Sequence, residues 1–293
     1  MSVIQLYRDD GSTVDYKLTS FTVEVKEKGV AVVSNATPKS LHALTTAFRT
    51  EMFFILEHCK RCDDIKVLIW TAQGDRAFSS GASFKAGVSI DVDPAIMKEY
   101  SRRGMSPNLA TDMALVRETK AFFDFPKPII GAINGMAVGG GANIALFYFD
   151  CVIASEQAKF TYPFVSIGLT PELGSSLMLP FFAGPHRAKE VILTGDWFSA
   201  QDARDWGLLN YVVPHKDLMS RAMEMALKLA AQPANQLMLS KRILNHHLGS
   251  FIDEHLNLEN TTILASRDAF GGAELFAQLA SRVAAKKGNK SKL

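Results

Sequence analysis

The amino-acid sequence predicts an α/β fold that ends in a helical region. Buried apolar runs alternate with helical segments up to about Trp197, and the chain beyond this point is almost wholly helical. The chain is also long enough for a large core, since 47% of its 293 residues are hydrophobic. We therefore expect a core region over residues 1–197 and a C-terminal helical region over residues 198–293.

The first elements are expected to be a hairpin, a helix and a buried strand. The β runs FTVEV (21–25) and VAVVSN (30–35) are joined by a charged turn that ends in Gly29, which is typical of a hairpin. Apolar residues at helical spacing predict an amphipathic helix from Ser40 to about Arg61. The run VLIWTA that follows is apolar throughout and predicts a buried strand.

Glycine-rich turns and further strand–helix units make up the middle of the chain. The loop QGDRAFSSGASF (73–84) and the polar segment 87–108 are of the kind that often carries function. Leu and Ala stripes on the last helices offer more apolar surface than a small region can bury alone, which predicts an oligomer. In chain order, we expect a helix over 109–123, a strand IIGAING (129–135), the Gly139-Gly140-Gly141 turn with a buried helix to Phe149, a strand CVIAS (151–155), a strand YVV (211–213) and helices near 215–231, 236–249, 251–268 and 272–285.

Composition argues against several classes of protein. A net charge of +2 is too small for a typical nucleic-acid binder. Three cysteines in a chain of this length predict a reducing compartment, and the CxxC of Cys59 and Cys62 has no second ligand pair at zinc spacing, so we expect packing at a helix end and no metal site. The uncharged stretch 128–149 holds five glycines and two asparagines, which favours a buried strand, turn and helix over a membrane span. No charged segment followed by an apolar one opens the sequence, which argues against a signal peptide.

The sequence ends in Ser291-Lys292-Leu293, a tripeptide that peroxisomal import receptors read at an extreme C-terminus. Basic residues that favour an exposed segment precede it. We therefore expect these three residues to bind an import receptor and the protein to lie in the peroxisome, or in a related organelle such as the glycosome.

Two turns of small residues stand out as candidates for chemistry. AFSSGASF (77–84) and NGMAVGGGANIAL (134–146) each lead from a strand into a turn where glycine lets the backbone approach a ligand closely. Free N–H groups at the start of a helix can stabilise an oxygen that gains negative charge, so two such turns can form an oxyanion hole. Either turn alone can equally connect two elements or hold a phosphate.

Together these turns resemble those of the crotonase superfamily, also called the enoyl-CoA hydratase/isomerase family. The resemblance rests on Phe78-Ser79-Ser80-Gly81-Ala82, on Gly135 to Gly141 and on Ala158 to Gly168. It implies a spiral of ββα units, a C-terminal helical region that builds trimers or dimers of trimers, and an acyl-CoA thioester as substrate, with no separate cofactor. It also implies that the N–H groups of Ala82 and Gly140 form the oxyanion hole. The positions expected to contact the acyl-CoA are Ser80, Gly81, Ala82, Ser83, Phe84, Gly140, Asn143 and Phe164.

Carboxylates distinguish the activities within this family. Its hydratases carry two glutamates, and the matching positions here are Asn143 and Phe164, neither of which can act as an acid or base. Members that move a double bond from the 3 to the 2 position need one carboxylate, and in the peroxisomal type it follows a proline, as Glu172 follows Pro171 here. Dienoyl-CoA isomerases would need their second acid at Phe164. The resemblance therefore implies a Δ3,Δ2-enoyl-CoA isomerase with Glu172 as its catalytic residue.

Residues around Glu172 support the same role and leave one alternative open. Apolar neighbours such as Phe164 and Leu169 are expected to raise the pKa of a carboxyl group, which suits one that takes and returns a proton. The alternative is that Glu172 only complements the dipole of a helix that starts at Pro171.

Other residues carry weaker expectations. Asp150 is expected to fix the core, and Arg76 and Lys85 are candidates for contacts with CoA phosphates. His246 and His247 are expected at the surface. The first turn departs from the family at Ala82-Ser83-Phe84, which affects the predicted shape of the acyl pocket.

The sequence thus predicts an enzyme that isomerises 3-enoyl-CoA to 2-trans-enoyl-CoA in the β-oxidation of unsaturated fatty acids. Two alternatives stay open: another crotonase activity such as enoyl-CoA hydration, and a non-catalytic acyl-CoA-binding protein.

Overall fold

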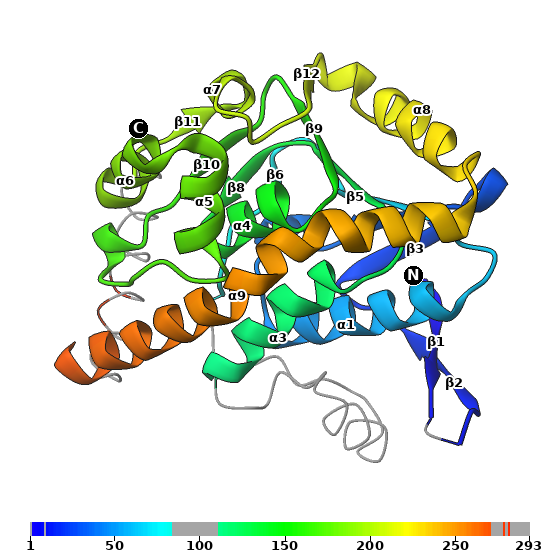
Figure 1. Cartoon of the computed structure of the whole chain (residues 1–293), viewed down its shortest axis with the longest axis horizontal. Coiled ribbons are helices and arrows are strands. Elements are labelled where there is room, and N and C mark those ends of the chain that lie inside the picture. The colour runs from blue at the N-terminus through cyan, green and yellow to red at the C-terminus, as the bar shows by residue number, and fades with distance from the viewer. Residues whose placement is uncertain (1, 9, 84–110, 271–277, 279–280, 282–293) are drawn as a thin grey trace.

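The computed structural model describes residues 2–8, 10–83, 111–270, 278 and 281. Among these residues the strands form two larger sheets and a separate N-terminal hairpin (Figure 1). The six-stranded sheet holds, in spatial order, β12 (Tyr211–Val213), β9 (Cys151–Ser155), β7 (Ile129–Ile133), β5 (Val67–Ala72), β4 (Val30–Asn35) and β3 (Phe21–Val25). The four-stranded sheet holds β11 (Phe198–Ser199), β10 (Lys159–Thr161), β8 (Met136–Val138) and β6 (Ala77–Ser79), and the hairpin holds β1 (Val3–Tyr7) and β2 (Thr13–Lys17).

From β5 to β10, consecutive strands alternate between the two larger sheets. β5 lies in the six-stranded sheet and β6, the next strand along the chain, lies in the four-stranded sheet; β7 with β8 and β9 with β10 repeat this step. Equivalent strands pair in parallel, β5 with β7 and β7 with β9 in one sheet and β6 with β8 and β8 with β10 in the other. The chain therefore winds as a spiral of repeated units, which confirms the predicted α/β fold class.

Helices cover both faces of the six-stranded sheet. α8 packs its buried alanines against Val67, Ile69 and Ile130 on one face, while aromatic and aliphatic residues of α1 and α3 pack on the other, where Trp70 contacts Phe122. This explains why β5 and β7 are buried along their whole length and read as continuous apolar runs. The helices are α1 (Thr46–Arg61), α3 (Thr111–Phe123), α4 (Gly140–Phe147), α5 (Ser175–Ala183), α6 (Pro185–Thr194), α7 (Ala200–Asp205), α8 (Leu218–Ala230) and α9 (Ala234–Phe270).

Two predicted helix boundaries are wrong. The first helix begins at Thr46, where the side chain of Thr45 accepts a hydrogen bond from the N–H of Phe48, and the preceding Leu41 and His42 have positive φ. The expected break near residue 250 does not occur, since α9 continues through Gly249 as one helix of 37 residues. A single glycine costs a helix only about 1 kcal/mol, and tertiary contacts compensate for that cost.

Other expectations hold or stay untested. The hairpin of β3 and β4, the strands β5, β7, β9 and β12, and helix α8 lie where the sequence predicts them. No element was predicted for the first twenty residues, where β1 and β2 lie. Strands β11 and β12 come after residue 197, yet β11 belongs to the four-stranded sheet and β12 to the six-stranded sheet. The division of the chain into two regions at residue 197 stays a prediction. The helix expected over 272–285 and the segment 87–108 lie outside the described residues.

Buried polar contacts hold the end of α1, where the CxxC lies, and the start of β7, where Asp150 binds, as expected for these residues. Lys127 donates from Nζ to the carbonyl oxygens of Cys59 and Cys62 at 2.7 Å each. Burial raises the pKa of the Cys59 thiol to about 12, so this group stays protonated. Asp150 accepts hydrogen bonds from the N–H of Ile129 and from Nζ of Lys241, both at 2.7 Å, and so fixes the start of β7.

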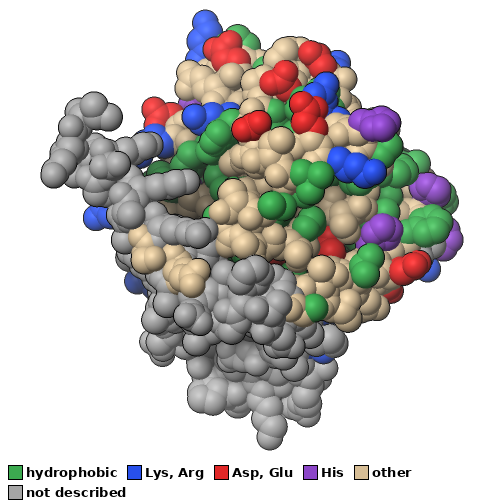
Figure 2. Space-filling view, turned by 90° about the vertical axis from the view of Figure 1, so that its left-hand side faces the viewer, with side chains coloured by type: hydrophobic (Ala, Val, Ile, Leu, Met, Phe, Trp, Pro, Cys, Tyr) green, Lys and Arg blue, Asp and Glu red, His purple; other side chains and the backbone are tan. Residues whose placement is uncertain are grey.

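The surface of the described residues is mixed in character. Apolar side chains lie between charged side chains and histidines on the face shown in Figure 2. His246 and His247 are exposed on α9, as expected. Among the described residues, no helix combines the length and the apolar character needed to cross a membrane.

Candidate functional site

The first small-residue turn is held by a backbone bridge to the segment before α1. Leu44 donates its N–H to the carbonyl oxygen of Gly81 at 2.9 Å and accepts from the N–H of Ser83 at 3.3 Å. In a parallel bridge of this kind the residue between the two bonded ones turns its own N–H away. The N–H of Ala82, an exposed residue, therefore points away from Leu44.

The second turn places a helix start at Gly140. Gly139, with φ 52°, donates to the carbonyl oxygen of Thr161 at 2.9 Å, and its own oxygen accepts from the N–H groups of Ala142 and Asn143. Gly140 is the first residue of α4, so no carbonyl of the helix can accept its N–H. This N–H is the second predicted oxyanion donor.

The two turns lie against each other because glycine alone fits at their contact. A Cβ on Gly81 would lie 2.5 Å from the carbonyl oxygen of Val138, and one on Gly141 would lie 2.7 Å from Cβ of Ser79. Leu44 contacts both turns, since its Cδ1 lies 3.2 Å from the Cβ position of Gly140. The structure thus brings together the two turns that the sequence singles out.

Glu172 lies beside the second turn. Its Oε1 is 3.5 Å from the Cβ position of Gly140, and Cδ1 of the adjacent Leu173 is 3.0 Å from the same point. A carboxylate, an N–H at a helix start and apolar side chains therefore meet at one place. This arrangement can remove a proton from a carbon whose neighbouring carbonyl oxygen is held by the backbone.

The alternative role of Glu172 as a first-turn helix acid is wrong. α5 begins at Ser175, three residues later, and has no acid in its first turn. Its free N–H groups are satisfied from α9: the carboxylate of Glu259 accepts from the N–H of Gly174 and from that of Ser176, each at 2.8 Å. Glu259, and not Glu172, is therefore the acid that caps this helix.

Asn143 and Ser175 hold the backbone at Glu172. Asn143 donates from Nδ2 to the carbonyl oxygen of Glu172 at 2.8 Å, and Oγ of Ser175 donates to the same oxygen at 2.8 Å. The next residue, Leu173, is buried and has a positive φ of 56°, which is unusual for a branched side chain. Contacts from α4 and α5 thus maintain a strained turn at the candidate base.

Phe164 fills the second position at which a hydratase of this family would carry an acid. Its side chain is buried, and its Cε1 lies 3.6 Å from the Cβ position of Gly139. The ring also stacks on Tyr162, with 6.0 Å between the ring centroids. A hydrocarbon ring therefore stands next to the second turn.

The other predicted contact residues are placed only in part. Ser80 donates its N–H to the carbonyl oxygen of Leu41 at 2.9 Å, so this backbone group serves the turn. Arg76 is exposed near the start of β6. Phe84 and Lys85 lie outside the described residues. Which of these residues contacts an acyl-CoA stays a prediction.

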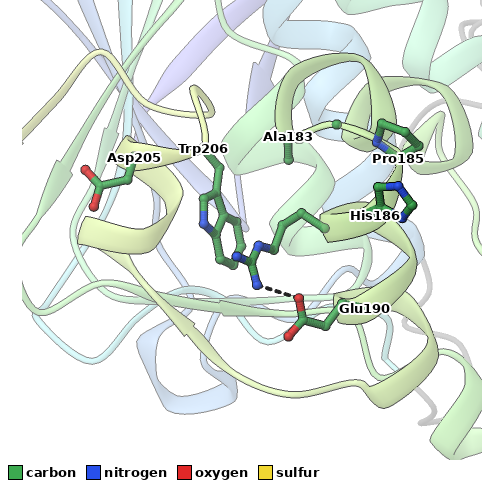
Figure 3. A pocket seen from close by; sticks show the side chains of 8 residues that line it. Ala183, Pro185, His186, Glu190, Asp205 and Trp206 are labelled. Atoms are coloured by element: carbon green, nitrogen blue, oxygen red, sulfur yellow. Dashed lines mark hydrogen bonds and ion pairs between the residues drawn. The ribbon is translucent and has the colours of Figure 1, made fainter.

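A separate hollow of about 510 Å³ lies where α5, α6 and α7 meet (Figure 3). Its charged groups already have partners: Arg187 forms an ion pair with Glu190, and its guanidinium lies 4.8 Å from the ring centroid of Trp206. None of the predicted site residues lines it. Its lining residues are Ala183, Gly184, Pro185, His186, Arg187, Glu190, Asp205 and Trp206. Within the described part of the chain, no group of three or more His, Cys, Asp or Glu side chains is placed to hold a metal ion.

Replacing Glu259 with glutamine is expected to loosen the turn at Glu172. An amide presents an NH₂ group to one of the two backbone N–H donors, so one capping hydrogen bond is lost and the protein is destabilised by about 1 kcal/mol. We expect a lower midpoint of thermal unfolding and a lower kcat with little change in KM. Glu254, exposed on the same helix, provides the control substitution Glu254→Gln. Equal kcat values in the two variants would show that the cap does not order the site.

Comparison with known proteins points to one family. A family model described as enoyl-CoA hydratase/isomerase matches residues 25–267. A 1,2-epoxyphenylacetyl-CoA isomerase of Escherichia coli is 33% identical over 247 residues, covering 83% of this chain and 88% of that protein. A short-chain-enoyl-CoA hydratase of Clostridium acetobutylicum is 32% identical over 236 residues, covering 80% of this chain and 85% of that protein.

Solved structures with the same fold carry related descriptions. The structure of an enoyl-CoA hydratase from Mycobacterium tuberculosis is similar with a TM-score of 0.68 and 30% identity, covering 85% of this chain and 100% of that one. An enoyl-CoA hydratase from Mycobacterium avium subsp. paratuberculosis gives a TM-score of 0.75 at 25% identity, covering 91% and 99% of the two chains.

Proposed function

The chain belongs to the enoyl-CoA hydratase/isomerase family, or crotonase superfamily, and we propose that within this family it is a Δ3,Δ2-enoyl-CoA isomerase. One observation carries this proposal. The carboxylate of Glu172 lies 3.5 Å from the Cβ position of Gly140, whereas the positions of the two hydratase acids hold Asn143 and Phe164.

The proposed reaction needs one acid/base group and two N–H donors. The thioester carbonyl oxygen accepts hydrogen bonds from Ala82 and Gly140, which acidifies the protons on C2. Glu172 takes one of these protons, and the electron pair of the broken C–H bond moves into the thioester as an enolate. The enolate then forms the C2–C3 double bond while the C3–C4 double bond opens and C4 takes the proton back from Glu172. Atoms and charge balance without water or a second acid.

Apolar neighbours favour isomerisation over attack by water. Leu44 and Leu173 contact the Cβ position of Gly140, and Phe164 contacts that of Gly139. Side chains of this kind offer water no hydrogen bond, so the proton on Glu172 is returned to carbon rather than exchanged.

Hydration is the second candidate activity. Relatives described as hydratases support it, and so does Asn143, whose Oδ1 is buried and has no hydrogen-bond partner among the described residues. A buried acceptor of this kind can bind one water molecule beside Glu172. A non-catalytic acyl-CoA-binding protein is the third candidate, and it predicts affinity without turnover.

The test compares two substrates with the purified full-length protein. We expect 3-hexenoyl-CoA to be converted to the 2-trans isomer faster than crotonyl-CoA is hydrated. Faster hydration would establish the second candidate, and binding of both substrates without conversion of either would establish the third.

We also propose a homotrimer or hexamer as the assembly. Exposed apolar residues on α5 and α9 support it, since α5 exposes 50% of Phe181, and α9 exposes 73% of Ile243 and 76% of Leu244. A monomer seldom leaves neighbouring large apolar side chains in contact with water. Mass measurement by light scattering tests the proposal.

We further propose that the protein acts in the peroxisome or a related organelle, where acyl-CoA chemistry of unsaturated fatty acids takes place. The tripeptide Ser291-Lys292-Leu293, outside the described residues, supports this by its sequence alone. Removing it from a fluorescently labelled protein, with the fluorophore at the N-terminus, is expected to change a punctate image to a diffuse one. A punctate image without the tripeptide would contradict the proposed signal.

A further inference from the structure

A buried ion pair lies behind the candidate site, between two helices that are far apart in sequence. Arg49 of α1 donates from Nη1 to Oε2 of Glu118 of α3 at 2.6 Å. Only 15% of the arginine side chain and 2% of the glutamate side chain are exposed. α1 and α3 run side by side in Figure 1, and α9 lies along α3. Burying charges of this kind costs desolvation free energy, which only a well-placed partner of opposite charge can offset.

The charge of Arg49 lies within electrostatic range of Glu172 as well as of its ion-pair partner Glu118. Burial of the guanidinium opposes its charge, but the carboxylates of Glu118 and Glu172 hold the pKa of Arg49 above its ordinary value. α3 also contacts the turn at Glu172 directly, since Cγ2 of Thr119 lies 3.7 Å from the Cβ position of Gly174. The ion pair of Arg49 and Glu118 is therefore close to the turn that carries Glu172.

Glu118 depends on this cation. Burial raises the pKa of Glu118, and the charge and hydrogen bond of Arg49 act in the opposite direction. Its second oxygen, Oε1, has no hydrogen-bond partner among the described residues. Glu118 is therefore a weakly satisfied carboxylate that binds Arg49 through one oxygen.

We propose that Arg49 and Glu118 are positioning residues that set the proton affinity of Glu172, with Arg49 stabilising its carboxylate and Glu118 limiting that stabilisation. This inference rests on the proposed acid/base role of Glu172. A base paired fully with a buried cation would be too weak to take a proton from C2, and one without any cation would return the proton too slowly. Sharing Arg49 between two carboxylates gives Glu172 an intermediate proton affinity, which suits a group that both takes a proton from C2 and returns it to C4.

Other ionisable groups near Arg49, Glu118 and Glu172 are expected to keep their charge and their contacts when Arg49 or Glu118 is substituted. Burial raises the pKa of Tyr148 well above its ordinary value, with the charge of Glu118 adding to the effect, so this phenol is neutral. Glu259 is bound to the N–H groups at the start of α5, and Nδ1 of His255 lies 3.4 Å from Oγ of Ser176.

Two substitutions are expected to shift the acid limb of the pH profile of kcat/KM in opposite directions. Arg49→Gln removes the cation, so Glu172 binds its proton more tightly and the limb moves to higher pH by about 1 unit. Glu118→Gln leaves the whole charge of Arg49 to Glu172, so the limb moves to lower pH by about 1 unit. Arg49→Lys retains the cation and is expected to restore most of the wild-type profile.

A second buried ion pair provides the matched control. Lys241 and Asp150 are joined at 2.7 Å, with 8% of the lysine side chain exposed. Lys241→Met is expected to lower the midpoint of thermal unfolding without moving the acid limb. If Arg49→Gln and Glu118→Gln shift the limb in the same direction, or leave it where Lys241→Met leaves it, the pair is only structural and the proposal is overturned.

A titration that needs no turnover separates this proposal from the proposed function. In protein labelled with ¹³C at glutamate side chains, the signal lost in Glu172→Gln belongs to Glu172, and its midpoint can be followed by NMR. We expect the midpoint to rise in Arg49→Gln and to fall in Glu118→Gln even if the protein isomerises no enoyl-CoA. If the titration midpoint of Glu172 is the same in the wild-type protein and in folded Arg49→Gln and Glu118→Gln variants, the inference is overturned, whatever the activity.

Discussion

Glu172→Gln is expected to lower kcat for 3-enoyl-CoA isomerisation by about 10³-fold, because a positioned acid/base group contributes on that scale and no second one is proposed here. The amide has nearly the shape of the carboxylate but takes no proton from C2. Asn143 and Ser175 bind the backbone oxygen of residue 172, so the substitution leaves their hydrogen bonds in place. Binding of acyl-CoA is therefore expected to change little.

The measurement is kcat and KM with 3-hexenoyl-CoA, together with the affinity for a saturated acyl-CoA. Glu156→Gln, which alters an exposed glutamate after β9, is the control and is expected to match the wild-type protein. An isomerase rate in Glu172→Gln within a factor of a few of the control would exclude Glu172 as the base. If that variant instead loses hydration and isomerisation together, Glu172 serves both reactions.

Gly140→Pro is expected to lower kcat by about 10² to 10³-fold relative to Gly140→Ala, because an oxyanion donor contributes on that scale. Both variants place a Cβ at the same point, 3.0 Å from Cδ1 of Leu173 and 3.2 Å from Cδ1 of Leu44, so both require these side chains to shift slightly. Only proline lacks the N–H. Proline is also well accepted at the first position of a helix, which Gly140 occupies in α4.

The ratio of the two variants removes the effect of the Cβ and leaves the loss of the N–H together with the bulk of the proline ring that replaces it. Circular dichroism and thermal unfolding establish that both retain the fold. Equal kcat values in Gly140→Pro and Gly140→Ala would show that this N–H does not hold the thioester oxygen, whatever the loss relative to the wild-type protein.

The strands of the six-stranded sheet were predictable from the sequence, and the short strands of the four-stranded sheet were not. Strands such as β5 and β7 consist wholly of buried residues, so their apolar runs are continuous and easily recognised. β6, β8 and β10 have three residues each, too few for any periodicity. The expected break in α9 failed for a different reason, since the intrinsic cost of Gly249 is small beside the contacts of a helix packed along its length.

Some residues of the candidate site could be predicted from the sequence, and others could not. Glycine turns and the proline before Glu172 are local patterns, and they indicated the residues that the structure brings together at Gly140. Glu259 and Glu118 show no local pattern, because their partners are 85 and 69 residues away along the chain. Such contacts arise only from the packing of α3 and α9, which a single sequence does not reveal.

The cap that Glu259 provides has a consequence for the order in which the protein matures. The turn at Glu172 leaves the ribosome well before the carboxylate that orders it, which lies 85 residues beyond Gly174. During synthesis the spiral of sheets can form while this turn still lacks its two capping hydrogen bonds. We therefore expect the turn at Glu172 to become ordered only when α9 docks, so a chain interrupted before that helix would lack the cap of the candidate site.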